Sequence, residues 1–112
     1  MGGRDYLGEF ELVVLLALAR LDDAAYGASI HREILAATGR DVSIPAVYVT
    51  LKRMERKGLV ASHLGQSDSN TGRPTRNYRI LPDGQEAVER SRELFARLLD
   101  GLGDPIAGAS GG

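Results

Sequence analysis

The most constraining feature of the sequence is a stretch near its start that is apolar on almost every side. Residues 8–22, GEFELVVLLALARLD, have the length and composition of a helix. At helical spacing Leu12, Leu15, Leu16 and Ala19 form one stripe, and the apolar residues between them extend it around most of the circumference. Such a helix must be covered on all sides, which one domain of 112 residues with a modest core can do only in part. We therefore expect a second chain to cover the rest.

The segments that follow predict the order helix, helix, strand, strand, helix. The expected elements are helices over about 26–37, 43–57 and 85–102 and strands over 59–64 and 76–81. The third helix follows the second after a short link, and a polar loop rich in turn residues joins the strands. The fold class predicted is α+β, mainly α: a winged helix-turn-helix of three helices and a two-stranded wing, followed by a C-terminal helix.

Local signals mark the ends of the second and third helices. Gly39 is expected to end the second helix as a C-cap. Ser43 is expected to cap the third, where Pro45 is tolerated because the first turn needs no intrahelical donor. Gly58 is expected to end it.

The chain divides into three parts. We expect residues 1–81 to form the winged helix-turn-helix domain, 82–103 a C-terminal dimerisation helix, and the glycine-rich residues 104–112 a disordered tail. The longest apolar run, 12–19, is too short to cross a bilayer, and the N-terminus lacks the order of a signal peptide. Because the sequence also has no cysteine, disulfides and thiolate metal sites are excluded, and we expect a cytoplasmic protein.

Charge is unevenly distributed along the chain. The net charge is only −1, which does not by itself suggest a nucleic-acid binder. Residues 43–79, however, contain seven basic and two acidic residues, a local charge of +5, whereas the remainder carries −6. Such a split is the electrostatic footprint expected of a nucleic-acid contact. Chance clustering on a solvated surface explains the charge pattern alone equally well.

The third helix has one face for a core and one that suits DNA. Val47, Leu51 and Met54 fall on one side, with Ile44 close by, and are expected to pack inward. The other side mixes an aromatic ring, small apolar residues and cations: Pro45, Tyr48, Val49, Lys52, Arg53 and Arg56. Cations pair with phosphates or guanine edges, a valine can touch a thymine methyl, and a tyrosine hydroxyl can bind a phosphate. A solvated amphipathic helix is the alternative that this pattern leaves open.

The expected wing, residues 65–76, is a second basic element. Arg73 and Arg76 lie at or beside a hairpin tip that Pro74 stiffens. A basic tip beside a basic helix can reach the adjacent minor groove or its phosphates. Two basic elements at this spacing favour DNA binding more specifically than either one alone. With the helix cap, the expected DNA-binding residues are Ser43, Pro45, Tyr48, Val49, Lys52, Arg53, Arg56, Arg73 and Arg76.

The last helix carries an apolar seam. Its residues at spacings of 3, 4, 3 and 4 are Val88, Ser91, Phe95, Leu98 and Leu102. The seam could pack on the chain's own core, but the uncovered first helix favours a dimer in which it covers that helix of a partner. The expected dimer interface comprises Leu12, Leu16, Val88, Phe95, Leu98 and Leu102. A symmetric dimer presents two recognition helices to successive turns of the major groove, so its operator is expected to be palindromic.

Four stretches resemble the PadR family of winged-helix transcriptional regulators. They are LGEFELVVLLAL, AYGASIHREI, VSIPAVYVTLKRMERKGLVAS and GRPTRNYRILPDG, and the similarity spans roughly residues 7–100. The resemblance implies a homodimeric, DNA-binding repressor whose third helix enters the major groove while the wing touches the flanking backbone. The short last helix is similar to the compact branch of the family. Ile44 and Val49 depart from prolines common in the family, so an operator should not be carried over from a relative.

Other functions find little support in the sequence. An enzyme needs a convergent set of reactive groups, whereas His31 and His63 fall on different elements and the glycines form no phosphate loop. No metal or cofactor is expected. A winged-helix module that binds proteins and not DNA is the serious alternative, supported by the net charge of −1 and the acidic remainder of the chain.

A small-molecule effector is left open. Some members of the resembled family bind aromatic ligands near the dimer interface. Tyr6, Phe10 and Phe95 are the few aromatic residues that could line such a site, and the sequence has no tryptophan. We expect these three side chains to serve core or interface packing, so no effector is predicted.

Overall fold

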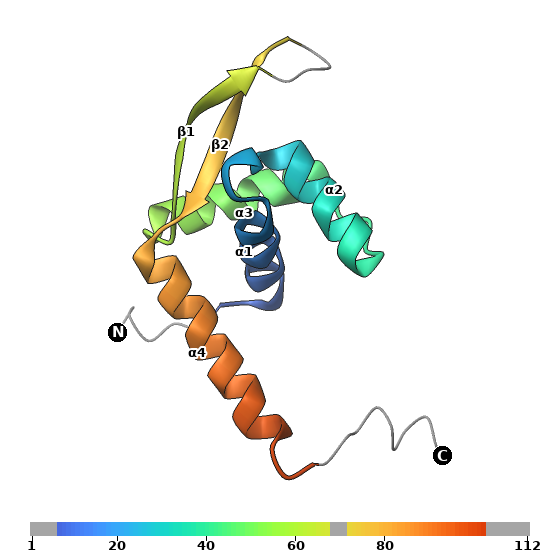
Figure 1. The fold of residues 1–112 in the computed structure, drawn as a ribbon, viewed down its shortest axis with the longest axis vertical. Helices are drawn as coiled ribbons and strands as arrows, with labels where there is room; N and C mark the ends of the chain where they lie inside the picture. The colour runs from blue at the N-terminus through green and yellow to red at the C-terminus, as the bar shows by residue number, and fades with distance from the viewer. Residues whose placement is uncertain (1–6, 68–71, 103–112) are drawn as a thin grey trace.

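The computed structural model describes residues 7–67 and 72–102. Its elements are α1 (Glu9–Leu21), a short 3₁₀ turn (Asp22–Ala24), α2 (Gly27–Thr38), α3 (Ile44–Arg56), β1 (Val60–Ser67), β2 (Pro74–Ile80) and α4 (Pro82–Leu99). The first three helices form a compact body, the β-hairpin projects from it, and α4 extends away in the opposite direction (Figure 1). The predicted order of helices and strands, and with it the predicted fold class, is therefore confirmed.

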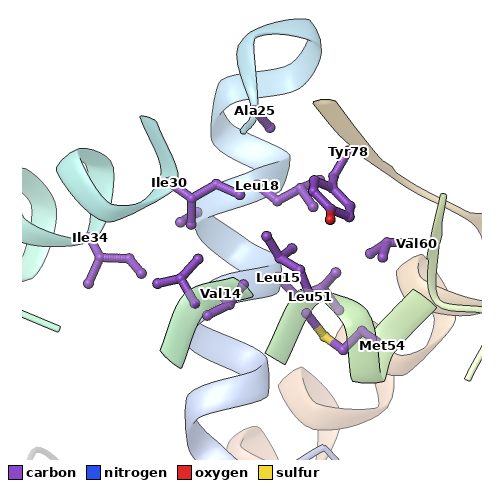
Figure 2. Close-up of a cluster of buried hydrophobic side chains, with 12 residues drawn as sticks. Val14, Leu15, Leu18, Ala25, Ile30, Ile34, Leu51, Met54, Val60 and Tyr78 are labelled. Carbon is purple, nitrogen blue, oxygen red and sulfur yellow. The ribbon is translucent and has the colours of Figure 1, made fainter. Parts of the chain in front are cut away.

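Helix α1 lies at the centre of the hydrophobic core (Figure 2). Its buried side chains meet those of α2 on one side and of α3 on another, and the hairpin closes the cluster. The largest fully buried side chains are Val14, Leu15, Leu18, Ile30, Ile34, Val47, Leu51, Met54, Val60 and Tyr78. Each such apolar side chain stabilises the fold by roughly 1.5–3 kcal/mol relative to exposure. The core thus fixes α3 against α1 through the inward face of α3.

The structure decides which side of α1 faces the core. Leu15 is buried, but Leu16 and Ala19 are exposed and Leu12 is only partly buried. Val14 and Leu18 take the inward positions beside Leu15. A helix that is apolar all round carries no signal for its own rotation, so only the packing against α2 and α3 decides it.

The helix ends largely follow the local signals. The Ser43 hydroxyl accepts a hydrogen bond from the Ala46 amide at 3.1 Å, and Gly39 and Gly58 stand at the ends of α2 and α3 as predicted. Helix α4 is the exception, because it begins at Pro82 and not near residue 85, and ends at Leu99, so Leu102 of the predicted seam lies beyond it. Proline is well suited to a first helical turn, so the segment read as a turn is the start of the helix.

Gly84 holds the start of α4 against the hairpin. A β-carbon at this position would lie 2.3 Å from the carbonyl oxygen of Leu59 and 2.8 Å from a side-chain carbon of Ile80. The Leu81 amide also donates to the Leu59 carbonyl oxygen at 2.9 Å. Only a residue without a β-carbon permits this approach, so the first turn of α4 is fixed against the base of the β-hairpin.

The wing is longer than predicted, and a third short segment of the chain pairs with it. Strands β1 and β2 are antiparallel, with Leu64 opposite Arg76, and both extend into the segment read as a loop. Tyr26 forms an isolated bridge to Asn77, so the turn before α2 pairs with the outer edge of β2. The expected tip falls partly on residues 68–71, which lie outside the described residues, as does the tail 104–112.

A buried amide anchors the root of the wing. The Asn77 side chain donates to the Asp23 carbonyl oxygen at 2.8 Å, and the Tyr78 amide donates to the Ala25 carbonyl oxygen at 2.8 Å. Asn77 is buried, so these bonds satisfy polar groups that would otherwise be costly to desolvate. The wing is therefore tied to the turn between α1 and α2.

Among the helices described, none is long and apolar enough to cross a membrane.

Candidate nucleic-acid interface

Helix α3 separates the core from a solvent-facing strip. Val47, Leu51 and Met54 are fully buried, as predicted. Ile44 is not part of the core, because it is the first residue of the helix and remains 39% exposed between the exposed Ser43 and Pro45. The inward face is thus shorter than the sequence indicated, and the N-terminal turn of α3 is open to solvent.

The solvent-facing strip runs the length of α3. Pro45, Val49, Lys52 and Arg56 recur three or four residues apart and are all exposed. Within the described part of the chain, Lys52 and Arg56 form no ion pair or side-chain hydrogen bond. Their charges are therefore not compensated inside the protein. Among the described residues these two cations have no ion-pair partner and lie beside exposed apolar side chains. Such a surface favours contact with nucleic acid, which offers both phosphates and base edges.

Tyr48 lies on the flank of α3 that meets α2. A β-carbon on Gly27 would lie 2.2 Å from Cζ of the Tyr48 ring, so the ring crosses the start of α2 directly over this glycine. Tyr48 nevertheless remains 39% exposed. Tyr48 is therefore held in place by packing while part of its surface stays accessible.

Arg53 lies on the opposite flank, where α3 meets α1. Its Nη1 atom is 3.7 Å from Oε2 of Glu11, and Nζ of Lys57 is 3.1 Å from the same oxygen. The other carboxylate oxygen of Glu11 accepts the Gly8 amide at 3.1 Å. Arg53, predicted only as a DNA contact, is thus also part of an internal charge cluster that the sequence did not reveal.

The surroundings of Glu11 keep its side chain charged. Burial raises the pKa of this carboxyl, but the Gly8 amide, Lys57 and Arg53 together outweigh burial and hold the pKa below its usual value. The carboxylate is therefore negative at neutral pH and balances two cations at the end of α3. Among the described residues, this pairing leaves Lys52 and Arg56, on the strip itself, as the cations of α3 without a partner.

A chain of hydrogen bonds joins the wing to α3. The Arg76 guanidinium donates to the Ser62 hydroxyl at 3.2 Å, and this hydroxyl donates to Oε2 of Glu55 at 2.7 Å. These three residues come from β2, β1 and α3. The wing and α3 are therefore linked through polar side chains as well as through the core. Arg73, also predicted to contact DNA, is exposed just before β2.

The expected dimer residues fall into two groups. Val88 packs partly buried against the chain's own core, and Ser91 of the same seam is buried. Beyond this point Phe95, Leu98 and Leu102 are 52%, 65% and 64% exposed. On α1, Leu16 is exposed and Leu12 is partly buried, so Leu16 adds to the uncovered apolar surface. The seam on α4 is thus used by the chain in its first half and left uncovered in its second.

The remaining candidates do not assemble into a site. His31 and His63 lie on α2 and β1, and His31 is 3.3 Å from Asp41. Over residues 7–67 and 72–102 there is no group of three or more His, Cys, Asp or Glu side chains placed to hold a metal ion. Phe10 packs partly buried against the core and Phe95 is exposed, whereas Tyr6 lies outside the described residues.

Comparison with known proteins gives concordant results. The sequence model of the PadR-like transcriptional regulator family matches residues 14–90. Similar solved structures include a PadR family transcriptional regulator from Eggerthella lenta, at 27% identity and TM-score 0.64, with 88% of this chain and 86% of that chain covered. RosR from H. salinarum is 25% identical at TM-score 0.66, with coverages of 85% and 79%.

A third structure supports the fold alone. The PadR-like transcriptional regulator from Bacillus cereus is 20% identical, with a TM-score of 0.69 and coverages of 87% and 90%. No curated protein matches the chain.

Proposed function

Because this chain belongs to the PadR-like family of transcriptional regulators, we propose that it is a homodimeric repressor that binds a palindromic operator through residues 43–57 and the wing 65–76. Membership of this family implies DNA binding and a regulatory, non-enzymatic role. The observation that carries the proposal is the exposed strip on α3, where Lys52 and Arg56 have no internal partner among the described residues.

In the proposed complex α3 lies in the major groove. Lys52 and Arg56 bind phosphates or guanine edges, and the exposed part of Tyr48 offers a hydroxyl to a phosphate. Arg53 contacts the DNA backbone while its guanidinium stays near Glu11. The wing arginines contact the flanking minor groove or its phosphates. The residues proposed to contact DNA are Ser43, Pro45, Tyr48, Val49, Lys52, Arg53, Arg56, Arg73 and Arg76.

The proposed dimer follows from the uncovered half of α4. Apolar side chains as exposed as Phe95 and Leu98 on α4, with Leu102 just after its end, form a surface that a monomer seldom leaves open. A second copy covers it together with the exposed Leu16 and the half-buried Leu12 of α1. Val88 contributes from the base of α4. In this arrangement residues 1–81 bind DNA and residues 82–103 join the two chains.

The alternative function is a winged-helix module that docks on proteins. The acidic remainder of the chain favours it, since that surface repels DNA. The unpaired cations of α3 argue against it. Retention on a heparin column at low salt discriminates between the two, because an acidic docking module should pass through while a DNA-binding protein is retained.

The decisive experiment is fluorescence anisotropy with DNA from upstream of the protein's own gene, repeated over a salt series. We expect saturable binding, two chains per site and a steep fall of affinity with salt. Replacing Arg56 or Arg73 by alanine should lower the salt slope by about one unit each. Arg92→Ala, an exposed change on α4, is the matched control and should leave the slope unchanged. Absence of binding to this and to random DNA at low salt would move the function to protein docking.

A further inference from the structure

The solvent-facing strip of α3 has an apolar centre that folding does not explain. Val49 is 57% exposed, with Pro45 one turn before it and Lys52 and Arg56 after it on the same face. A β-branched residue on an exposed helical surface gains little from burial and has a lower helix propensity than alanine. Single exposed apolar residues are common, so exposure alone means little. What distinguishes Val49 is its position on the same exposed face as Lys52 and Arg56, the cations proposed to bind DNA.

The chemistry of the major groove offers one partner for such a side chain. Its base edges present hydrogen-bond donors and acceptors, and the C5-methyl group of thymine is the apolar group among them. Lys52 and Arg56, one and two turns further along the strip, would fix α3 in the groove through phosphates or guanine edges. Val49 has no donor or acceptor on its side chain, so contact with polar base edges would leave them unsatisfied.

We propose that Val49 recognises a thymine methyl group, so that each half-site of the operator carries a thymine at the position facing this residue. The inference rests on the proposed function and specifies the sequence that the same surface prefers. At that base pair, contact with the methyl group, and not a hydrogen bond, determines the sequence preference. Pro45 widens the apolar surface on the N-terminal side of the contact.

The test begins with a random duplex library from which the purified full-length protein selects its preferred sites. Each thymine of the selected half-site is then replaced by deoxyuridine, which removes only the methyl group. We expect one thymine per half-site at which this change weakens binding about fourfold, the factor expected for one buried methyl group. Changing both half-sites together should weaken binding roughly fifteenfold, because the two contributions multiply.

Protein variants assign the effect to Val49. In Val49→Ala the ratio of thymine to deoxyuridine affinities should fall to about one, while the salt slope stays at the wild-type value because no charge is removed. The matched control is Leu35→Ala, which changes a side chain of α2 that is 42% exposed. This control should retain the wild-type ratio. Far-ultraviolet circular dichroism of both variants verifies that the helices remain intact.

Two results would overturn the inference, and they have different consequences. A selected site whose thymine-to-deoxyuridine ratio is the same in wild type and Val49→Ala shows that Val49 rests on sugar or backbone, and leaves the proposed repressor function intact. If no duplex is bound even at low salt, both the inference and the proposed function fail.

Discussion

Helices α3 and α4 each have an apolar side and a charged side, but α3 buries that apolar side within the chain whereas α4 leaves half of it exposed. Val47, Leu51 and Met54 are fully buried, whereas Phe95 and Leu98 are more than half exposed. Because the core satisfies the inner face of α3, its outer face is held rigidly and is available to a ligand. Helix α4 packs on the body through its first half, and its second half extends away from the three helices (Figure 1). The same kind of sequence pattern thus completes a domain in one case and, in the other, leaves the apolar surface on which the proposed dimer rests.

The largest expected effect comes from placing charge on the uncovered half of α4. The double change Phe95→Glu and Leu98→Glu should prevent dimerisation, because four carboxylates would be brought together in the interface. Without a dimer each half-site binds alone, so affinity for a palindromic operator should fall by about 10²–10⁴-fold. Analytical ultracentrifugation and anisotropy measure the two effects. Arg92→Glu, which adds a carboxylate to an exposed position of the same helix, should leave the dimer intact. A dimeric double variant with normal affinity would place the interface elsewhere.

The next effect compares the two helices directly through one kind of truncation. Leu51→Ala removes a fully buried side chain of α3 and should lower the free energy of unfolding by about 2–5 kcal/mol. Leu98→Ala removes an equal volume from α4. If a second copy covers Leu98, its cost should grow with protein concentration, because assembly contributes to stability. Urea unfolding at two concentrations measures both. A Leu98 cost within about 0.5 kcal/mol at every concentration would mean that this surface is unpartnered.

The sequence predicts those features that local chemistry decides. The inward triad of α3, its Ser43 cap and the glycines that end α2 and α3 follow from spacing and residue type alone. The exposed strip follows from the same periodicity. The order of helices and strands is also local, and it was sufficient for the winged helix-turn-helix fold.

Features decided by packing were not predictable. The rotation of α1 was ambiguous because its apolar residues encircle it, so the inward positions of Val14 and Leu18 appeared only in the structure. The close approach of Gly84 to Leu59 joins residues far apart in the chain, and no local signal encodes it. The pairing of Arg53 with Glu11 joins residues far apart in the chain, so the partner of this arginine appeared only in the structure.

A smaller effect tests how firmly α4 is fixed at its start. Gly84→Ala would place a β-carbon 2.3 Å from the Leu59 carbonyl oxygen, a backbone atom that cannot swing aside. The first turn of α4 must shift, and we expect a loss of about 1–3 kcal/mol in the free energy of unfolding. Urea unfolding measures it. Gln85→Ala, an exposed change on the next residue, should cost less than about 0.5 kcal/mol. If the two variants unfold alike, the start of α4 is not held by this contact.

The smallest effect sharpens the comparison at the end of α3, which an internal charge cluster ties to α1. Since the folded pKa of Glu11 lies below its usual value of 4.5, its contribution to stability is present above that pH and is lost as pH falls through the folded pKa. Glu11→Gln should therefore destabilise the protein by about 1–2 kcal/mol at pH 7, the scale of hydrogen bonds to a charged group. Urea unfolding between pH 7 and 3 should show the difference from wild type shrinking with acid. Glu9→Gln changes an exposed carboxylate of the same helix and is the control. A difference that stays constant with pH would mean that Glu11 acts through its shape and not its charge, and that α3 is held by its apolar face alone.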